Sequence, residues 1–564
     1  MTGLGRFVLR LLAVSLLVCA GLASAMLAAG APLRPGAATT RAGSTMATTT
    51  TATTTASVPT TSVSTARSAL VLTGHGWGHG LGLAQWGAYG YAKHGWTYDQ
   101  ILAHYYSGTT LGIARVAAVR VLLAAEHKAT LASTVPWNVT DGSGTVVQLD
   151  PGSLVLKGGL EVGDQQLASP LTFRSSQPLT VDKKACRGRI VVSSDGKLLQ
   201  VVDTLALESY VKGVVPEEMP SSWAAEALKA QAVATRSYAL ANLAHGRGFD
   251  VYADTRSQVY GGVSAESLAT TAAVHATKRQ IVLYNGKVAD TLFFSSSGGR
   301  TASAVETTGI GVPYLVSVAD PYDTLSPYHD WGPVVFDLAQ VGKLLKLTSP
   351  IDDVQTTTGT SKRVKTLTVT TDDELQVRLT GNQLRAELGL RSTWFTPALL
   401  ELLPPTKAMT YGGAASLTGF ARGAVDSLSL ESRIGTGAWT PAGDIVLDAE
   451  GAFSTIVRPQ VTTRYRLVSG NVRIGLARVR VAPGIDLQST SATGLLGAIR
   501  PALTGAPVEL QQQQADLSWL TLSTTLTDEG AWSFGSALDP GTYRVRCAPG
   551  HGLVPGVSTT FVLP

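Results

Sequence analysis

Residues 208–246 read ESYVKGVVPEEMPSSWAAEALKAQAVATRSYALANLAHG and place two adjacent carboxylates, Glu217 and Glu218, directly ahead of a long helix. Pro220 follows them and cannot continue a preceding helix. We therefore expect both acids on a short loop at the mouth of the helix. An acid held in such a place is a candidate for chemistry.

The helix itself is predicted over residues 224–244, which are mostly strong helix formers. Ser221 or Ser222 can cap its start, and Gly246 stands where a helix end favours a residue that tolerates positive φ. Small residues dominate, so we expect close packing on several sides. A polar row follows helical spacing on one face: Gln231, Thr235, Tyr238 and Asn242.

The chain has 564 residues, which is too long for one ordinary core, so about three or four folded units are expected. Its formal charge of +5 suits an anionic environment such as a bacterial wall, but also a slightly basic soluble protein. No basic run with interleaved aromatics indicates a nucleic-acid partner.

Residues 1–25 are typical of a secretory signal, with Arg6 and Arg10 ahead of an apolar run. Cleavage is expected after Ala25. The alternative is an uncleaved anchor, because apolar residues continue to Ala31, and this would be the only membrane contact. The prediction is a secreted protein, extracellular or associated with the cell wall.

Residues 26–68 are predicted to be a threonine-rich disordered linker, either glycosylated or a plain spacer. Beyond the signal only Cys186 and Cys547 remain. A disulfide between them is allowed outside the cell, but the sequence leaves the pairing open, and two lone cysteines give no zinc signature.

Residues 74–106 form a glycine-histidine motif, GHGWGHGLGLAQWGAYGYAKHGWTYDQILAHYY. Its clustered glycines let backbone approach another strand or a ligand, and helices are expected over residues 83–93 and 97–106. The spacing of His75 and His79 would suit a metal site on a helix, but the glycines between them deny that geometry. Structural or substrate-contacting histidines are the preferred interpretation.

Residues 116–203 show short alternating apolar runs, and Asp195-Gly196 predicts a hairpin between the last two. A second helix is expected over residues 266–278, followed by another hairpin at Asn285-Gly286.

That hairpin leads to a serine cluster, residues 295–300, at a strand end. The cluster lacks the Gly-x-Ser-x-Gly elbow of a nucleophile, so hydrogen bonding to a polar ligand is the better interpretation. The aromatic loop at residues 312–331 suits either sugar rings or ordinary packing.

The last 160 or so residues contain an internal repeat of roughly eighty residues, at 405–483 and 484–564. Each copy combines short strands, one tryptophan such as Trp439 or Trp519, and a late tyrosine-containing strand. The pattern predicts two all-β sandwiches of immunoglobulin or fibronectin type, acting as spacers or wall-binding modules.

The motifs together resemble the stage II sporulation protein D (SpoIID/LytB) family. The resemblance rests on VVPEEMPSSWAAEALKAQAVATRSYAL, DTRSQVYGG, FFSSSGGRTAS, PYLVSVADPYD and the glycine-histidine motif. It implies an α+β catalytic domain over residues 69–400. Here the glycine-histidine motif precedes the glutamate segment, a permuted order that works only if both pieces share one site.

The resemblance implies a lytic transglycosylase that cleaves the MurNAc–GlcNAc β-1,4 bond of peptidoglycan strands stripped of stem peptides, in partnership with an amidase. The catalytic glutamate of the family precedes Met-Pro and corresponds to Glu218. Some members carry zinc-binding cysteines beside the polar loop. Residues 253–257 contain none, so no metal or other cofactor is predicted.

Further polar residues of the matched motifs are proposed to line the cleft, each with an alternative structural role: His79, Gln85, Arg236, Tyr238, Gln258, Tyr260, Ser297 and Arg300. For Arg236 the alternative is an ion pair with an acid in the core.

A single glutamate suffices for this reaction, first as acid and then as base, because the 6-hydroxyl of the substrate attacks the anomeric carbon. Burial beside Met219 and Trp223 should raise the pKa of Glu218, whereas a nearby helix N-terminus would stabilise its charged form by roughly 0.3–1 kcal/mol. Glu217 is expected to be an exposed neighbour; as a second catalytic acid it would imply hydrolysis. The alternative function is a wall-binding or amidase-stimulating protein that does not cut glycan.

Overall fold

The computed structural model describes residues 62–64, 66–115, 118–244, 248–423, 425, 427–491, 494–535 and 538–563. The predicted signal, most of the predicted linker and Gly246 lie outside these residues. In the described part of the chain, every helix is too short or too polar to cross a membrane.

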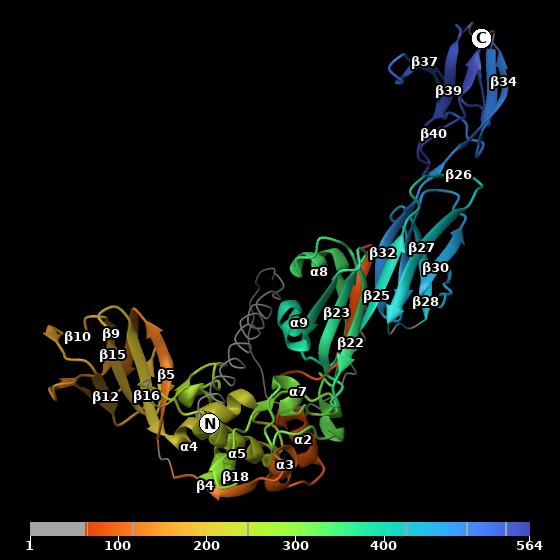
Figure 1. Ribbon diagram of the computed structural model, residues 1–564. Helices are drawn as coiled ribbons and strands as arrows, with labels where there is room; N and C mark the ends of the chain where they lie inside the picture. The colour runs from red at the N-terminus through yellow and green to blue at the C-terminus, as the bar shows by residue number, and fades with distance from the viewer. Residues whose placement is uncertain are drawn as a thin grey trace, which may run out of the picture.

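The described chain forms a row of units, with a β unit and a helical centre at one end and two further β units at the other (Figure 1). This arrangement is multidomain and mostly β-sheet. The two segments that resemblance assigns to the site meet in the helical centre.

The first β unit lies between the glycine-histidine motif and the glutamate segment in the chain. Its larger sheet runs in the order β17 (Val251–Tyr252), β5 (Ala118–Glu126), β16 (Leu199–Ala206), β15 (Arg189–Ser194), β12 (Leu171–Ser175), β7 (Trp137–Thr140) and β8 (Val146–Leu149). The other strands are β14 (Lys184–Cys186), β13 (Leu179–Val181), β6 (Lys128–Ser133) and β9 (Gly152–Lys157) in one sheet, and β10 (Glu161–Val162) with β11 (Gln165–Gln166). The hairpin predicted at Asp195-Gly196 is confirmed as the β15–β16 connection.

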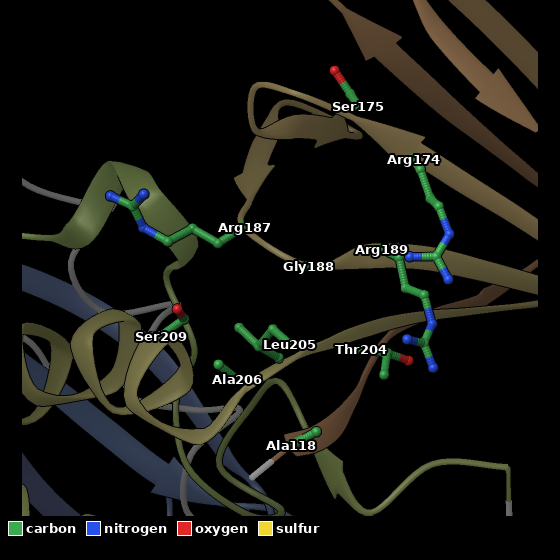
Figure 2. A pocket seen from close by; sticks show the side chains of 10 residues that line it. All are labelled: Ala118, Arg174, Ser175, Arg187, Gly188, Arg189, Thr204, Leu205, Ala206 and Ser209. Carbon is green, nitrogen blue, oxygen red and sulfur yellow. The ribbon is translucent and has the colours of Figure 1, made fainter. Parts of the chain in front are cut away.

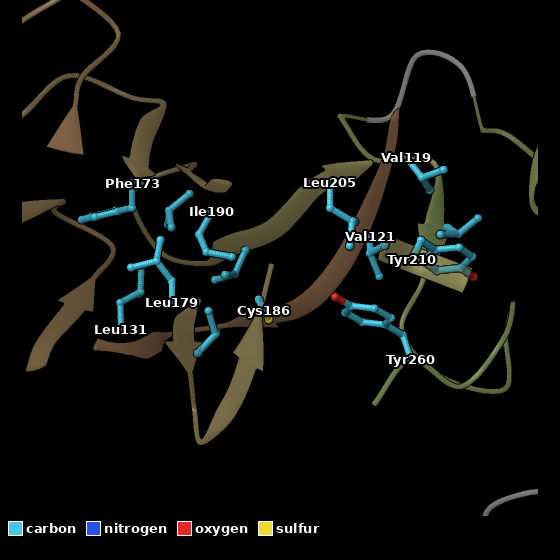
Figure 3. Close-up of a cluster of buried hydrophobic side chains, with 14 of the residues drawn as sticks. Val119, Val121, Leu131, Phe173, Leu179, Cys186, Ile190, Leu205, Tyr210 and Tyr260 are labelled. Atoms are coloured by element: carbon cyan, nitrogen blue, oxygen red, sulfur yellow. The ribbon is translucent and has the colours of Figure 1, made fainter. Parts of the chain in front are cut away.

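The core of this unit continues into the helical centre. Phe173 and Ile190 of the sheets pack in the same cluster as Tyr210 and Tyr260, with buried Cys186 between them (Figure 3). The β unit therefore fixes the base on which the candidate site is built.

The helical centre contains the segments of the resemblance. Its helices are α2 (Gln85–Lys93), α3 (Tyr98–Tyr105), α4 (Leu207–Glu218), α5 (Ala225–Ala241), α6 (Leu268–Ala276) and α7 (Ala304–Thr308), with short 3₁₀ turns η1 (Gly262–Ala265) and η2 (Pro321–Leu325). Small sheets are made by β19 (Lys287–Val288), β18 (Gln280–Tyr284) and β4 (Thr110–Ile113), and by β20 (Phe293–Phe294) with β3 (Leu83–Ala84). The hairpin predicted at Asn285-Gly286 is confirmed.

The predicted helices exist, but two details around the glutamates were wrong. Glu217 and Glu218 are the last residues of α4 rather than loop residues, and Pro216 lies inside that helix. The following helix has Ala224 as its N-cap, without a side-chain cap, because residues 220–223 first make a turn in which the Trp223 N–H bonds to the Pro220 carbonyl.

A five-stranded sheet joins the helical centre to the next unit. It runs in the order β21 (Asp330–Asp337), β2 (Ser68–His75), β25 (Phe395–Leu403), β27 (Ala415–Gly423) and β30 (Ala452–Val457). One face packs against α8 (Leu338–Leu344), α9 (Gly381–Leu388) and the sheet of β22 (Ile351–Thr358), β23 (Val364–Thr371) and β24 (Gln376–Thr380).

The other face of the same sheet closes the first C-terminal β unit. Its opposing sheet is β1 (Ser62–Val63), β32 (Val472–Val479), β31 (Thr463–Ser469), β28 (Leu428–Ile434) and β29 (Thr440–Asp444), and β26 (Met409–Thr410) pairs with β33 (Val481–Ala482). Leu70 and Leu72 of β2 face one core, whereas Ala69 and Val71 face the other. β25 thus runs through the boundary expected near residues 400–405, and β1 lies within the segment expected to be a linker.

The last β unit has two sheets around its own core. They contain β34 (Gly484–Ser491), β35 (Gly494–Arg500) and β38 (Ala531–Phe534), and β37 (Trp519–Leu526), β36 (Pro507–Gln513), β39 (Gly541–Cys547), β40 (Gly556–Val557) and β41 (Phe561–Leu563). Arg544 stacks 4.1 Å over Trp519, as Arg466 stacks 4.2 Å over Trp439 in the unit before. Equivalent residues of the repeat therefore make equivalent contacts. Cys186 and Cys547 are both buried and free.

Candidate functional site

Glu218 is placed by the end of α4. Met219 is the C-cap of the helix, and its N–H bonds back to the Val215 carbonyl. A helix C-terminus carries partial negative charge, which disfavours a carboxylate. The dipole of α4 therefore disfavours the charged form of Glu218. The sequence analysis expected the opposite effect, because it considered only the N-terminus of α5.

The loop at residues 257–261 is held against α4 by close packing. A Cβ at Gly213 would lie 2.6 Å from the ring of Tyr260, so only glycine allows this approach. The Gly261 N–H bonds to the Gly213 carbonyl at 2.9 Å, and the Tyr260 hydroxyl donates to Asp203 at 2.9 Å. These contacts bring the backbone N–H of Val259 within hydrogen-bonding reach of the Glu218 carboxylate.

The glycine-histidine motif reaches the same carboxylate from the other side. β3 pairs in parallel with β20, and Gly82 with φ +74° allows the Leu292 carbonyl to approach. The Leu83 N–H then bonds to that carbonyl at 3.1 Å. Directly after β3, the buried side chain of Gln85 hydrogen-bonds to Glu218. The two segments named by the resemblance therefore meet, although they are more than a hundred residues apart in the chain.

The pKa of Glu218 is raised to about 7. Burial is the main cause, and the negative charge of Glu217 adds to it; hydrogen bonds from Val259 and Gln85 oppose it by stabilising the charged form. The side chain is half-buried, so substrate can still reach it. A carboxyl with such a pKa is present in both protonation states near neutral pH, as a group that acts first as acid and then as base requires.

Three aromatic side chains, from α2 and from the turn after α4, pack together close in sequence to Gln85 and Glu218, and the sequence did not single out two of them for the site. Trp223 stacks on Tyr89 with ring centroids 4.7 Å apart, and Trp86 lies 4.7 Å from Trp223. All three are half-buried, so part of each ring faces solvent. We call Trp86, Tyr89 and Trp223 the aromatic wall. The signal that could have found it is the immediate sequence proximity of Trp86 and Trp223 to Gln85 and Glu218.

Tyr238 and Gln258 also lie at the site. The charge of Glu218 helps to raise the pKa of Tyr238, after burial and the charge of Asp290. Gln258 is buried and accepts from the Tyr210 hydroxyl at 3.0 Å, while its amide nitrogen has no partner among the described residues. Asp290 is a second acid of this region that the sequence missed; burial raises its pKa to about 6, and Asn242 donates to it at 2.9 Å.

Other predicted cleft residues make structural contacts instead. Arg236 is fully buried and forms a two-point ion pair with Glu208, at 2.9 and 3.0 Å, which is the core pairing considered as its alternative role. Tyr260 is buried on Asp203. Both nitrogens of His79 bond to backbone, at Leu81 and Phe293, and burial lowers its pKa to about 4.

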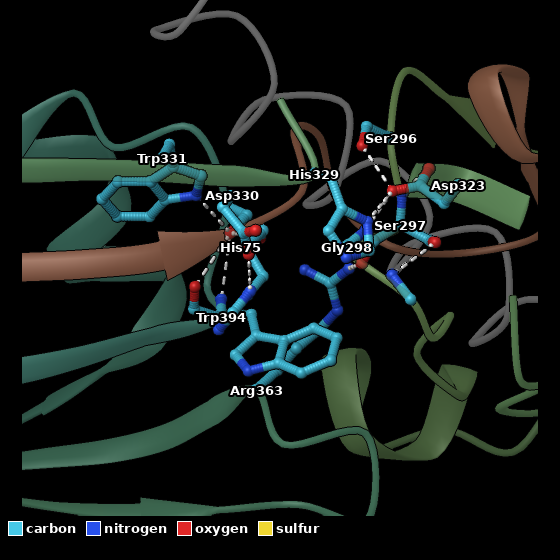
Figure 4. A network of polar contacts seen from close by, with 12 residues as sticks. His75, Ser296, Ser297, Gly298, Asp323, His329, Asp330, Trp331, Arg363 and Trp394 are labelled. Atoms are coloured by element: carbon cyan, nitrogen blue, oxygen red, sulfur yellow. Dashed lines mark hydrogen bonds and ion pairs between the residues drawn. The ribbon is translucent and has the colours of Figure 1, made fainter. Parts of the chain in front are cut away.

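Ser297 belongs to a buried polar network around Asp323 (Figure 4). Asp323 accepts from the Ser296 hydroxyl, the backbone N–H groups of Ser297 and Gly298, and His329, at 2.8–3.0 Å. This acid therefore organises the serine cluster, and the Ser297 hydroxyl accepts from the Gly299 N–H at 3.0 Å. Arg300 lies next to it, half-buried, with a backbone bridge to Ala319.

The four histidines of the glycine-histidine motif each contact protein groups rather than one another. His75 bonds to Asp330 at 2.6 Å, and His94 bonds to the Gly90 carbonyl at 2.8 Å. His104 bonds to the Ala319 carbonyl at 3.0 Å. Across the described residues, His, Cys, Asp and Glu side chains do not gather in any group of three that could hold a metal ion.

The part of the chain that carries this site is similar to known proteins. Residues 195–284, which carry Glu218, match the family model described as stage II sporulation protein, SpoIID. This region of the chain is therefore similar to the SpoIID family. The match leaves the two C-terminal β units outside it.

Three relatives are similar over part of their length. Stage II sporulation protein D of Bacillus subtilis is 34% identical over 23% of this chain and 42% of its own, and the amidase enhancer of that organism is 33% identical over 38% of this chain and 29% of its own. An uncharacterised protein of Brachyspira hyodysenteriae is 39% identical over 26% of this chain and 41% of its own. This chain thus spans less than half of each relative.

Among solved structures, the chicken interferon gamma receptor alpha chain is similar over 29% of this chain and 96% of its own, at 7% identity and a TM-score of 0.18. A likeness this weak carries no conclusion.

Proposed function

We propose that the protein is a secreted lytic transglycosylase that cleaves the MurNAc–GlcNAc β-1,4 bond of peptide-stripped peptidoglycan strands. The observation that carries the proposal is the half-buried carboxyl of Glu218, whose pKa is raised to about 7 at the end of α4. The aromatic wall supports it, because flat half-exposed rings suit the C–H faces of sugars.

In the proposed reaction, protonated Glu218 donates its proton to the glycosidic oxygen as the bond from that oxygen to the anomeric carbon breaks. The 6-hydroxyl of the same muramoyl residue attacks the anomeric carbon. The Glu218 carboxylate, held by Gln85 and the Val259 N–H, takes the proton of that hydroxyl. The products are a 1,6-anhydro end and a free 4-hydroxyl, and no water is consumed.

Glu217 is exposed, and its Oε1 lies against Gly261. We assign it an electrostatic role: its charge helps to keep the neighbouring Glu218 protonated. A hydrolysis would need a second carboxylate that activates a water, and we assign that role to neither Glu217 nor Asp290, so the proposed reaction is transglycosylation.

The second candidate is a glycan-binding or amidase-stimulating protein without cleavage activity. The similarity to an amidase enhancer favours it. The two C-terminal β units, which we interpret as immunoglobulin- or fibronectin-like spacers or wall-binding modules, suit either function.

The test is mass analysis of the products from peptide-free glycan strands, with the full chain and with Glu218→Gln. We expect anhydro ends from the wild type and a loss of roughly 10²–10⁴-fold in rate from Glu218→Gln, the usual contribution of a general acid–base group. Glu217→Gln is the matched control and should lose less than about tenfold.

Two results would separate the alternatives. Reducing ends in place of anhydro ends would mean hydrolysis. Binding of glycan without any product, unchanged in Glu218→Gln, would favour the non-catalytic function.

A further inference from the structure

A cavity of about 450 Å³ lies at the opposite end of α4 from Glu218 (Figure 2). It opens between the end of the large sheet in the first β unit and the first turn of α4. Its size is within the range of ligand sites. We call it the arginine cavity, after three of its lining residues: Arg174, Arg187 and Arg189.

Two of these arginines are direct neighbours on adjacent strands. Phe173 of β12 pairs with Ile190 of β15, which places Arg174 opposite Arg189 in the antiparallel register. Figure 2 shows both side chains on the same side of the sheet, with Arg189 beside Thr204. Like charges directly opposite each other in a sheet are destabilising.

No carboxylate of the described chain neutralises this pair. Arg187 is bound by Glu266 at 2.6 and 2.7 Å, and Arg120, further along the same row of the sheet, is bound by Asp250. The guanidinium groups of Arg174 and Arg189 have neither an ion pair nor a hydrogen bond to any described residue, and both residues are exposed. The cavity therefore retains two unpaired positive charges.

The other lining residues add further hydrogen-bond donors. Ser209 and Thr204 supply hydroxyl groups, and Ala206 is the N-cap of α4 without a side-chain cap. The first N–H groups of the helix and its partial positive charge favour an anion at this end. Arginine forks and helix N–H groups are suited to the paired oxygens of a carboxylate or phosphate.

We propose that the arginine cavity binds an oxyanion of the cell-wall polymer, either the lactyl carboxylate that stem-peptide removal frees on muramic acid or a phosphate ester of a phosphate-bearing polymer. The site is distinct from Glu218, about 17 Å away along α4 at 1.5 Å per residue. It does not depend on whether Glu218 cleaves glycan.

Binding is measured by calorimetry on the full chain at low salt, with N-acetylmuramic acid as the carboxylate probe and with glycerol 3-phosphate and inorganic phosphate as the phosphate probes. We expect binding of at least one probe, weakened about tenfold or more in the double variant Arg174→Gln/Arg189→Gln and weakened by added salt. A preference for one probe identifies the source of the oxyanion.

The matched control is Arg458→Gln/Arg478→Gln, which removes two exposed charges from the first C-terminal β unit. It should bind as the wild type does. Absence of binding to every probe in the wild type, or equal binding by the two double variants, would overturn the proposal. A readout that needs no variant is NMR of the arginine Nε–H groups, where at least two signals should shift on phosphate or muramic acid addition; unchanged signals would also overturn it.

Discussion

At each end of α4 there is a charge of the sign that the helix dipole disfavours: a carboxylate at the C-terminal end and arginines of the neighbouring sheet at the N-terminal end. Glu218 lies at the C-terminal end, where the macrodipole disfavours a negative charge, and the arginine cavity lies at the N-terminal end, where it disfavours positive charge. Between them, Glu208 in the first turn follows the stabilising rule and pairs with Arg236. Charges retained against stability are typical of functional sites.

The two ends differ in how they hold their charge. At Glu218 the protein removes water and keeps the group partly neutral, which prepares a proton for transfer. At the arginine cavity the positive charges of Arg174 and Arg189 stay exposed and unpaired, so they can attract an anion. The first arrangement suits chemistry and the second suits binding.

The larger energetic effect is expected at the C-terminal end. Because the pKa of Glu218 is raised from 4.5 to about 7, the native state binds the proton more tightly than the unfolded chain, so stability falls as pH rises between these values. Glu218→Gln removes this loss. The free energy of unfolding of this variant, relative to the wild type, should rise by about 3 kcal/mol between pH 4 and pH 8, because the pKa shift is about 2.5 units at about 1.4 kcal/mol per unit.

Denaturant unfolding of the full chain at several pH values measures this difference, followed with a probe in the helical centre because the chain has several units. Glu217→Gln serves as control and should show a much smaller pH-dependent gain. A constant difference between Glu218→Gln and wild type across this pH range would contradict the burial of the acid.

A smaller effect is expected at the N-terminal end. Arg189→Gln relieves the repulsion with Arg174, so without ligand it should raise the free energy of unfolding by about 0.2–1 kcal/mol at low salt. Arg187→Gln, which breaks the ion pair with Glu266, should not stabilise. Destabilisation by Arg189→Gln would mean that its side chain has a structural role instead.

Local sequence signals predicted the secondary structure around the site well, because hairpin dipeptides and helix formers act within a few residues. The predictions that the sequence could not make concern residues whose roles depend on partners far away in the chain. Arg236 could not be assigned until Glu208 was seen 28 positions away in the chain. His79 and Ser297 looked available in their motifs, but backbone groups bond to both side chains: Leu81 and Phe293 bond to His79, and the Gly299 N–H donates to the Ser297 hydroxyl.

The position of Glu218 in α4 was missed for a different reason. Pro216 inside the helix and Pro220 after it both argue for a loop, but the surrounding packing keeps the last turn helical. The sequence motifs named Glu218 as the catalytic acid and Gln85 as a cleft residue; the structure brings these two side chains together, and the catalytic role stays a prediction. Asp290 needed the fold, because it comes from a separate segment, whereas Trp86 and Trp223 stand close to Gln85 and Glu218 in the sequence.

The most direct test is the titration of Glu218 itself by ¹³C NMR of carboxyl-labelled glutamates, assigned with Glu218→Gln. We predict a midpoint near pH 7, moved upward by Gln85→Leu, which removes a hydrogen bond to the charged form, and downward by Glu217→Gln, which removes a nearby negative charge. A midpoint near 4.5, insensitive to both substitutions, would contradict the role of Glu218 as a proton donor at neutral pH.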